Sequence, residues 1–136
     1  MSIWPETLLQ NTLETPASTL DSQANGLALL NEYVLISVSG PDADKLIQGQ
    51  CTCDTSTITQ LNWRLGAHCT AKGRMISSFL AWRKNDETFL LRLHHSIADI
   101  AIAALKKYAV FYKVTLNIEN SMLGFAVFAK AHQALD

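Results

Sequence analysis

Two apolar runs joined by a short polar link constrain the fold of this chain more than any other feature. MISSFLAWR (75–83) and ETFLLRL (87–93) have the length of strands, and the Asn85-Asp86 pair between them is typical of a tight turn. Strands connected by so short a turn pair antiparallel, because a parallel connection needs a crossover of about a dozen residues or more. The pattern therefore predicts a β-hairpin in a mostly antiparallel sheet.

The segments on either side of this hairpin predict two helices and further strands. PDADKLIQGQ (41–50) carries one apolar stripe at helical spacing, and a longer stripe runs from Ile97 to Tyr108. Ser96 is expected to cap the second helix, with Asp99 completing a capping box. Alternating apolar residues predict strands at 31–40 and 113–119, and further strands are expected at 65–71 and 122–129.

This order of elements predicts an α+β fold, a mostly antiparallel sheet with two main helices. No Gly-rich phosphate loop joins a strand to a helix, which argues against a dinucleotide-binding fold. We expect the polar residues 1–26 to form an N-terminal arm and residues 27–136 to form the folded unit. A helical pattern at 129–136 stops abruptly, and we therefore expect the chain to be truncated. A truncated domain would expose apolar surface, so we also expect self-association.

Composition argues against membrane and secreted proteins. The chain has 136 residues and is 49% hydrophobic, which is enough for one core. No apolar run approaches the roughly 18 residues of a transmembrane helix. The start, MSIWPETLLQNTLETP, has acids but neither Lys nor Arg, unlike a secretory or transit signal. Three cysteines without paired spacing favour a reducing, cytoplasmic location, and we expect no membrane partner.

Positive charge gathers in the middle of the chain. No Asp or Glu occurs from Thr55 to Asn85, whereas this segment holds five basic residues. Such a cluster attracts phosphates and other anions, although clusters of this size are also common on ordinary solvated surfaces. The candidates for anion or RNA contact are Arg64, Lys72 and Arg74, with Arg83 and Lys84 nearby.

The cysteines and a histidine are the obvious candidates for a metal site, because thiolates and imidazole suit zinc or an iron–sulfur cluster. Their spacing matches no common zinc motif, and the adjacent His68 and Cys69 would point to opposite faces of a strand. A Cys–His nucleophile pair would need an orienting acid, which residues 55–85 lack. We therefore expect structural cysteines, no metal and no catalytic thiol; the residues weighed are Cys51, Cys53, His68 and Cys69.

The aromatic residues divide by their neighbours. Phe79, Trp82 and Tyr108 stand in apolar patterns and are expected in the core. Tyr33 and Trp63 stand beside polar residues and are the better candidates to stack on a pterin or a base.

Three stretches together resemble the YgfZ branch of the family that includes the glycine-cleavage aminomethyltransferase, or T-protein. They are GPDADKLIQGQCTCDTSTI (40–58), AHCTAKGRMISSFLAWR (67–83) and LKKYAVFYKVTL (105–116). The resemblance implies one half of a duplicated folate-binding domain, with tetrahydrofolate or a derivative as the cofactor. It also implies a cytoplasmic, non-catalytic accessory factor that works with iron–sulfur enzymes and in tRNA modification.

The resemblance also bears on single residues. Tyr33 stands where close relatives carry a Trp that lines the folate site, so we expect Tyr33 to contact folate. Ser77 and Ser78 occupy the positions of an aspartate pair in the transferases, and a hydroxyl cannot replace a carboxylate that steadies a developing cation. The family's cysteine motif K-G-C-Y-x-G-Q-E is absent. Two alternatives stay open: an aminomethyltransferase-type enzyme, and an RNA-binding module that uses residues 64–84.

Overall fold

The computed structural model describes residues 26–119 and 125–128. The chain forms two compact units, residues 1–31 with 123–136, and residues 32–122. In the first unit, β1 (Gly26–Leu29) and β7 (Phe125–Phe128) pair antiparallel. The predicted arm, apart from Gly26, and the helical pattern at 129–136 lie outside the described residues.

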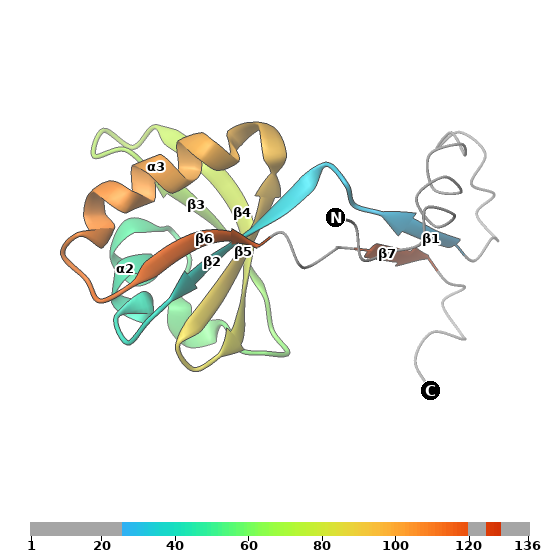
Figure 1. The fold of residues 1–136 in the computed structure, drawn as a ribbon, viewed down its shortest axis with the longest axis horizontal. Coiled ribbons are helices and arrows are strands. Elements are labelled where there is room, and N and C mark those ends of the chain that lie inside the picture. Colours follow the sequence, from blue (N-terminus) through green and yellow to red (C-terminus); the bar gives the residue numbers. More distant parts are fainter. Residues whose placement is uncertain (1–25, 120–124, 129–136) are drawn as a thin grey trace. The chain divides into compact units, whose positions relative to one another are not determined.

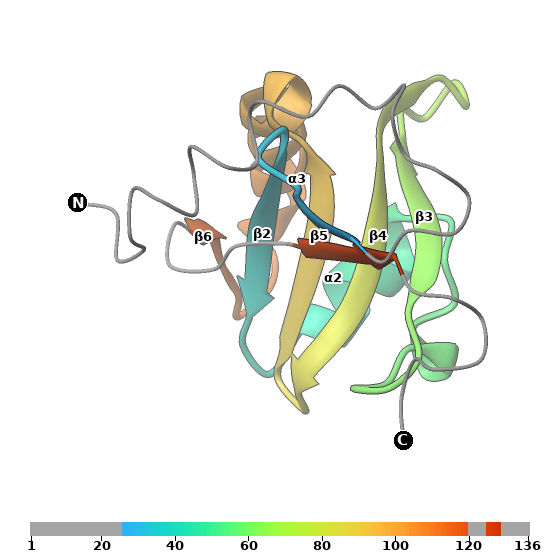
Figure 2. The same ribbon diagram turned by 90° about the vertical axis from the view of Figure 1, so that its right-hand side faces the viewer.

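The second unit is built on a five-stranded sheet in which every neighbouring pair is antiparallel. Figure 2 shows the strands side by side with the helices behind them. This sheet and its two helices confirm the predicted α+β fold. In spatial order the strands are β3 (Arg64–Cys69), β4 (Met75–Asn85), β5 (Thr88–His94), β2 (Tyr33–Ser39) and β6 (Thr115–Glu119).

Two helices, α2 (Ala43–Gln50) and α3 (Ala98–Ala109), cover one face of this sheet (Figure 1). Short 3-10 turns occur at Thr55–Thr57 and His95–Ile97. Alternate residues of the strands meet the apolar stripes of both helices, because strand side chains alternate between faces. The largest fully buried apolar side chains of the resulting core are Ile36, Val38, Leu46, Ile47, Ile58, Phe89, Leu91 and Leu105.

The predicted β4–β5 hairpin is present, but its turn lies one residue later than expected. Asn85 still pairs with Thr88, so the turn residues are Asp86 and Glu87. The Asn85 side chain then accepts a hydrogen bond from the Glu87 N–H at 3.1 Å. Side-chain hydrogen bonding to the backbone two residues on is the usual way in which Asn stabilises a turn.

The predicted capping box at α3 is wrong. The helix begins at Ala98 with Ile97 at the N-cap, and no side chain caps it. The Ser96 N–H and hydroxyl lie instead 3.2 and 2.8 Å from Nδ1 of His94. A preceding strand residue therefore holds Ser96 in the 3-10 turn, one residue too early to cap the helix.

No helix in the described ranges 26–119 and 125–128 is both long and apolar enough to span a membrane.

Gly40 lies where two distant segments approach closely. Its φ of +139° is a conformation that side chains rarely adopt, and a Cβ there would lie 2.2 Å from the Lys113 carbonyl oxygen. The Gly40 N–H also donates a hydrogen bond to the backbone carbonyl oxygen of Glu87 at 2.9 Å. The absence of a side chain at this position thus lets the end of β2 pack against the approach to β6.

We expect Gly40→Ala to destabilise the fold by about 2 kcal/mol or more, because the backbone must shift to relieve the clash. Gly73→Ala is the matched control. Gly73 also has a positive φ, +75°, but nothing lies within 4 Å of its Cβ position. Its substitution should cost only about 1 kcal/mol of conformational strain. Urea unfolding of both variants checks the difference, and equal losses would contradict the role of the close approach.

Candidate functional site

The sheet face opposite α2 and α3, called here the distal face, carries a row of side chains that crosses four strands. Leu65 pairs with Leu80, Leu80 with Arg92, and Arg92 with Leu35. Directly opposed residues in a sheet have neighbouring side chains on the same face. Arg92 is therefore the one cation of this row, and Glu119, the β6 partner of Leu35, continues the row on the fifth strand.

A surface pocket of about 320 Å³ includes Leu65, Leu80 and Arg92 of this row. This volume lies at the lower end of the range of small-molecule sites. Strands β2 to β5 all contribute to it, so a rigid sheet holds the pocket. Its described lining, called here the Tyr33–Arg92 pocket, is Tyr33, Leu65, Ser78, Phe79, Leu80, Arg92, Leu93, His94 and Ile97.

Arg92 has an unusual environment for a cation. Its Nε is buried and has no hydrogen-bond partner among the described residues, and none of the ion pairs found there includes it. Its guanidinium carbon lies 5.0 Å from the centre of the Tyr33 ring, within reach of a cation–π contact. A buried donor without a partner costs free energy, which an oxyanion bound by the guanidinium would offset.

Tyr33 and His94 form an aromatic wall beside Arg92. Tyr33 is 43% exposed. Its ring meets the His94 ring edge to face, with the ring centroids 6.0 Å apart. Nδ1 of His94 accepts the Ser96 N–H, which assigns the proton of the neutral ring to Nε2, 3.8 Å from a Glu32 carboxylate oxygen. The pocket thus combines flat aromatic surface with an unpaired guanidinium.

The two serines at the transferase aspartate positions lie on opposite faces of β4. Ser77 is buried on the helix-covered face, where it is the cross-strand partner of His68. Ser78 lines the Tyr33–Arg92 pocket. Only one of the two positions therefore faces the pocket, and it presents a hydroxyl. The described lining contains no carboxylate.

The basic residues predicted to contact anions do not form one patch. Arg64 begins β3, whereas Lys72 and Arg74 follow its end, so roughly 20 Å of strand separates them. Arg64 donates hydrogen bonds to the Thr57 hydroxyl at 3.1 Å and to the Trp63 carbonyl at 3.0 Å.

Arg83 is already paired within the protein. Its guanidinium lies 2.5 Å from a carboxylate oxygen of Asp44 and stacks over the Phe89 ring at 4.3 Å. The pairing leaves Arg83 poorly placed to contact an external anion.

The thiols of Cys51 and Cys53 lack the properties of nucleophiles. Burial, with a smaller contribution from the neighbouring thiols of Cys53 and Cys69, raises the pKa of Cys51 to about 12. Burial also raises the pKa of Cys53. Because the thiolate is the reactive form, both side chains are unreactive at neutral pH. Within the part of the chain that the structure describes, no three His, Cys, Asp or Glu side chains are placed to hold a metal.

His68 is a buried polar residue beneath α3. Its side chain is fully buried, its ring meets that of Tyr108 edge to face at 6.1 Å, and neither ring nitrogen has a partner among the described residues. Burial lowers the pKa of His68, because the charged form loses its hydration.

Tyr33 was predicted from the sequence to contact a ligand, whereas Arg92 was not among the predicted residues. The available signal was a lone arginine inside the apolar run ETFLLRL, where a charged side chain needs an explanation. Strand register makes this residue a neighbour of Tyr33, Leu65 and Ser78, and the register is a tertiary property.

Comparisons with known proteins bear on the identity of the chain. It is 42% identical over 104 residues to the tRNA-modifying protein YgfZ of Klebsiella pneumoniae (strain 342), which is 75% of this chain and 32% of that protein. It is 39% identical over 106 residues to YgfZ of Colwellia psychrerythraea, which is 78% of this chain and 32% of that protein. These relatives confirm the resemblance to YgfZ. The chain spans about a third of their length.

The fold has a match among solved structures. A glycine cleavage system aminomethyltransferase T from Bartonella henselae matches with a TM-score of 0.66 and 18% identity, over 71% of this chain and 27% of that one. The T-protein fold predicted from the sequence is thereby confirmed. No protein-family model matches the chain.

The buried His68 predicts a loss of stability in acid. Its pKa in the folded protein is lowered, so below the unfolded value of about 6.5 the unfolded state binds a proton that the folded state does not. The free energy of unfolding should therefore fall as pH drops from about 6.5, by at most about 1.4 kcal/mol per pH unit for one proton.

His68→Leu should flatten this pH dependence, because an apolar side chain of similar size binds no proton. Urea unfolding at several pH values between neutral and mildly acidic checks it. His95→Gln is the matched control, since it removes an exposed histidine and leaves His68 in place. An equal slope in the wild type and in His68→Leu would contradict the assignment.

Proposed function

We propose that this homologue of the YgfZ proteins is the folate-binding part of an accessory factor in tRNA modification, and that its Tyr33–Arg92 pocket binds a folate without transferring a one-carbon group. The observation that supports the proposal most is the half-buried Arg92. Its Nε is buried without a hydrogen-bond partner among the described residues, and its guanidinium lies beside the exposed ring of Tyr33.

The chemistry of folates matches these two features. A folate carries a flat pterin, a flat aminobenzoyl ring and glutamate carboxylates. Tyr33 offers a face for stacking, and Arg92 offers paired donors for a carboxylate. Leu65 and Leu80 supply the apolar surface that a ring system needs between these two contacts.

The absence of transfer chemistry is proposed from Ser78. Folate-dependent transfer needs a group that steadies a developing cation or moves a proton, and a serine hydroxyl with its high pKa does neither at neutral pH. The pocket's remaining polar side chains are the phenol of Tyr33, the imidazole of His94 and the guanidinium of Arg92. A carboxylate is missing from the described lining, so binding rather than catalysis is the proposed role.

The wider role rests on the relatives. Their names state that they modify tRNA, and we extend this role to the present chain as part of the proposal. Cooperation with iron–sulfur enzymes, a cytoplasmic location and self-association of the chain stay predictions from the sequence.

Titration of tetrahydrofolate into the 136-residue chain by calorimetry tests the folate pocket. We expect saturable binding that weakens roughly tenfold or more in Tyr33→Ala and in Arg92→Gln, because each loses a stacking surface or a charge-assisted contact. Tyr33→Trp should bind more tightly, since it enlarges the flat face. Arg74→Gln, an exposed arginine outside the pocket, is the control and should bind as the wild type does. Absence of binding at millimolar folate would overturn the proposal.

The non-catalytic role has its own test. Incubation of the wild type with tetrahydrofolate and an aminomethyl donor should yield no methylenetetrahydrofolate above the background reaction. Ser78→Asp, which restores a carboxylate in the pocket, is the informative comparison. Folate-dependent transfer by the wild type would instead favour the aminomethyltransferase alternative.

A further inference from the structure

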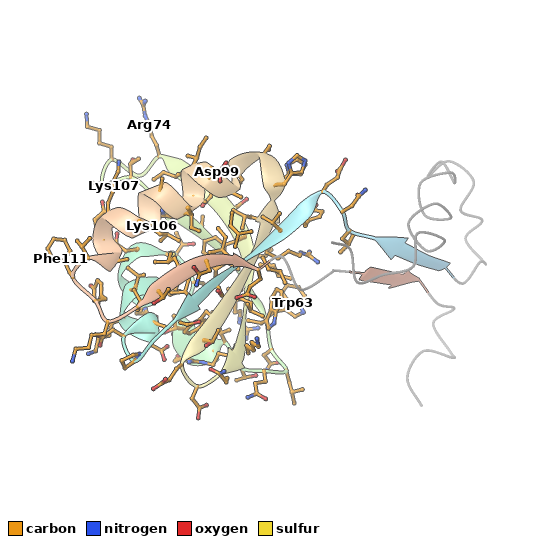
Figure 3. All side chains as sticks on the ribbon, in the orientation of Figure 1. Trp63, Arg74, Asp99, Lys106, Lys107 and Phe111 are labelled. Carbon is orange, nitrogen blue, oxygen red and sulfur yellow. The ribbon has the colours of Figure 1, made fainter. Side chains whose placement is uncertain are left out.

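The C-terminal half of α3 and the turn after it present an exposed surface of cations and apolar side chains. Phe111 is 80% exposed and Val110 is 75% exposed, although most large apolar residues of this unit are buried. We call this the α3 surface; it consists of Lys106, Lys107, Val110, Phe111 and Lys113, all exposed. Figure 3 shows Phe111 at the end of α3, with Lys106 and Lys107 along the helix.

The backbone around Phe111 is held firmly. Its N–H donates to the Tyr108 carbonyl at 3.1 Å, and the Tyr112 N–H donates to the Ala109 carbonyl at 3.0 Å. Tyr112, the next residue, packs against the core. This anchor directs the neighbouring Phe111 away from the core, so its exposure follows from the geometry of the turn.

The α3 surface carries an excess of positive charge. No acidic residue occurs in the sequence between Asp99 and Glu119. Asp42 does lie close, because one of its carboxylate oxygens accepts the Lys113 N–H at 3.0 Å. Its other oxygen pairs with Lys45 at 2.7 Å, so a further cation balances this acid. The three lysines of the surface form no ion pair with the described residues.

Two more cations lie nearby. The edge-to-face contact of His68 with Tyr108 brings the end of β3 against the C-terminal half of α3. Lys72 and Arg74 follow directly in the exposed β3–β4 turn. Figure 3 labels Arg74 above α3 and Lys107 on the helix, but Figure 2 shows the β3–β4 turn set apart from α3 across the sheet. Lys72 and Arg74 therefore flank the α3 surface without belonging to it, and that surface lies on the helix-covered side of the sheet, opposite the Tyr33–Arg92 pocket on the distal face.

We propose that the α3 surface binds RNA directly, with its lysines on backbone phosphates and Phe111 stacked on an unpaired base. Single-stranded and loop regions of RNA present both chemistries together, and proteins bind them with cations interleaved with exposed aromatic rings. A membrane-binding face would need a broader row of large apolar side chains than Val110 and Phe111 provide. An acidic peptide would satisfy the lysines but leave the Phe111 ring without a flat partner.

This inference rests on the proposed role in tRNA modification only for the choice of tRNA as the probe. The two sites lie on opposite faces of the sheet, so each can fail alone. Tyr33→Ala should lose folate and keep RNA binding, whereas Phe111→Ala should lose RNA binding and keep folate.

The test is fluorescence anisotropy with an unmodified tRNA transcript and a short single-stranded RNA, over a range of salt concentrations. We expect Phe111→Ala to weaken binding roughly tenfold, the effect of losing one stacked base, and Phe111→Trp to restore it. Lys106→Gln with Lys107→Gln should lower the slope of log K against log salt by about 1.4 for the single strand. Trp63→Ala and Lys84→Gln test the alternative contacts predicted from the sequence, because both side chains are exposed outside the α3 surface; binding as tight as in the wild type would place the contact on the α3 surface.

Three results would overturn the proposal. The first is absence of binding at low salt. The second is an equal loss in Phe111→Ala and Trp63→Ala, which would make the binding diffuse. The third is Phe111-dependent binding to vesicles containing anionic phospholipid, or to polyglutamate, with a lower dissociation constant than for RNA. That result would assign the surface to a membrane or to an acidic protein.

Discussion

The packing of α2 and α3 against one face of the five-stranded sheet is the interaction on which the rest of this unit depends. Each fully buried Ile, Leu or Phe at that interface contributes about 1.5–3 kcal/mol relative to its exposed state. Because successive strand side chains point to opposite faces of the sheet, the neighbour of each core residue lies on the distal face. Arg92 lies between the buried Leu91 and Leu93, so core packing also positions the pocket's cation.

The same alternation separates residues that are adjacent in the sequence. Ser77 lies under the helices and Ser78 lines the pocket, so the pair cannot act together on one ligand. His68 is buried beside Tyr108, where its charged form is disfavoured. A cluster of cysteine, histidine and cations along the chain is thus divided between the interior and an exposed turn, and no shared reaction centre results among the described residues.

The fold and the site carry different kinds of information about this chain. The T-protein fold recurs at 18% identity, because a sheet with two covering helices needs only the apolar pattern of its core. The pocket depends on single residues, and a hydroxyl at Ser78 alters what it can do without altering the packing. Function is therefore better argued from Tyr33, Ser78 and Arg92 than from the architecture.

Local pattern was sufficient for the elements themselves. The β4–β5 hairpin, the strand at Tyr33–Ser39 and both helices follow from periodicity, because the spacing of apolar residues depends on each element alone. Exact ends were less predictable. Ser96 had the residue type of an N-cap, but contact with His94 holds it in the preceding 3-10 turn.

The site required the tertiary structure. Tyr33 was identified from its polar neighbours and the family resemblance, but Arg92 was not, because its pairing with Leu35 and Leu80 joins segments far apart in the chain. The sequence also grouped Arg64 with Lys72 and Arg74, although strand length places them at opposite ends of β3. Composition and periodicity thus determined the elements and the core of this protein, whereas strand register decided which side chains meet, since register depends on contacts that no local segment contains.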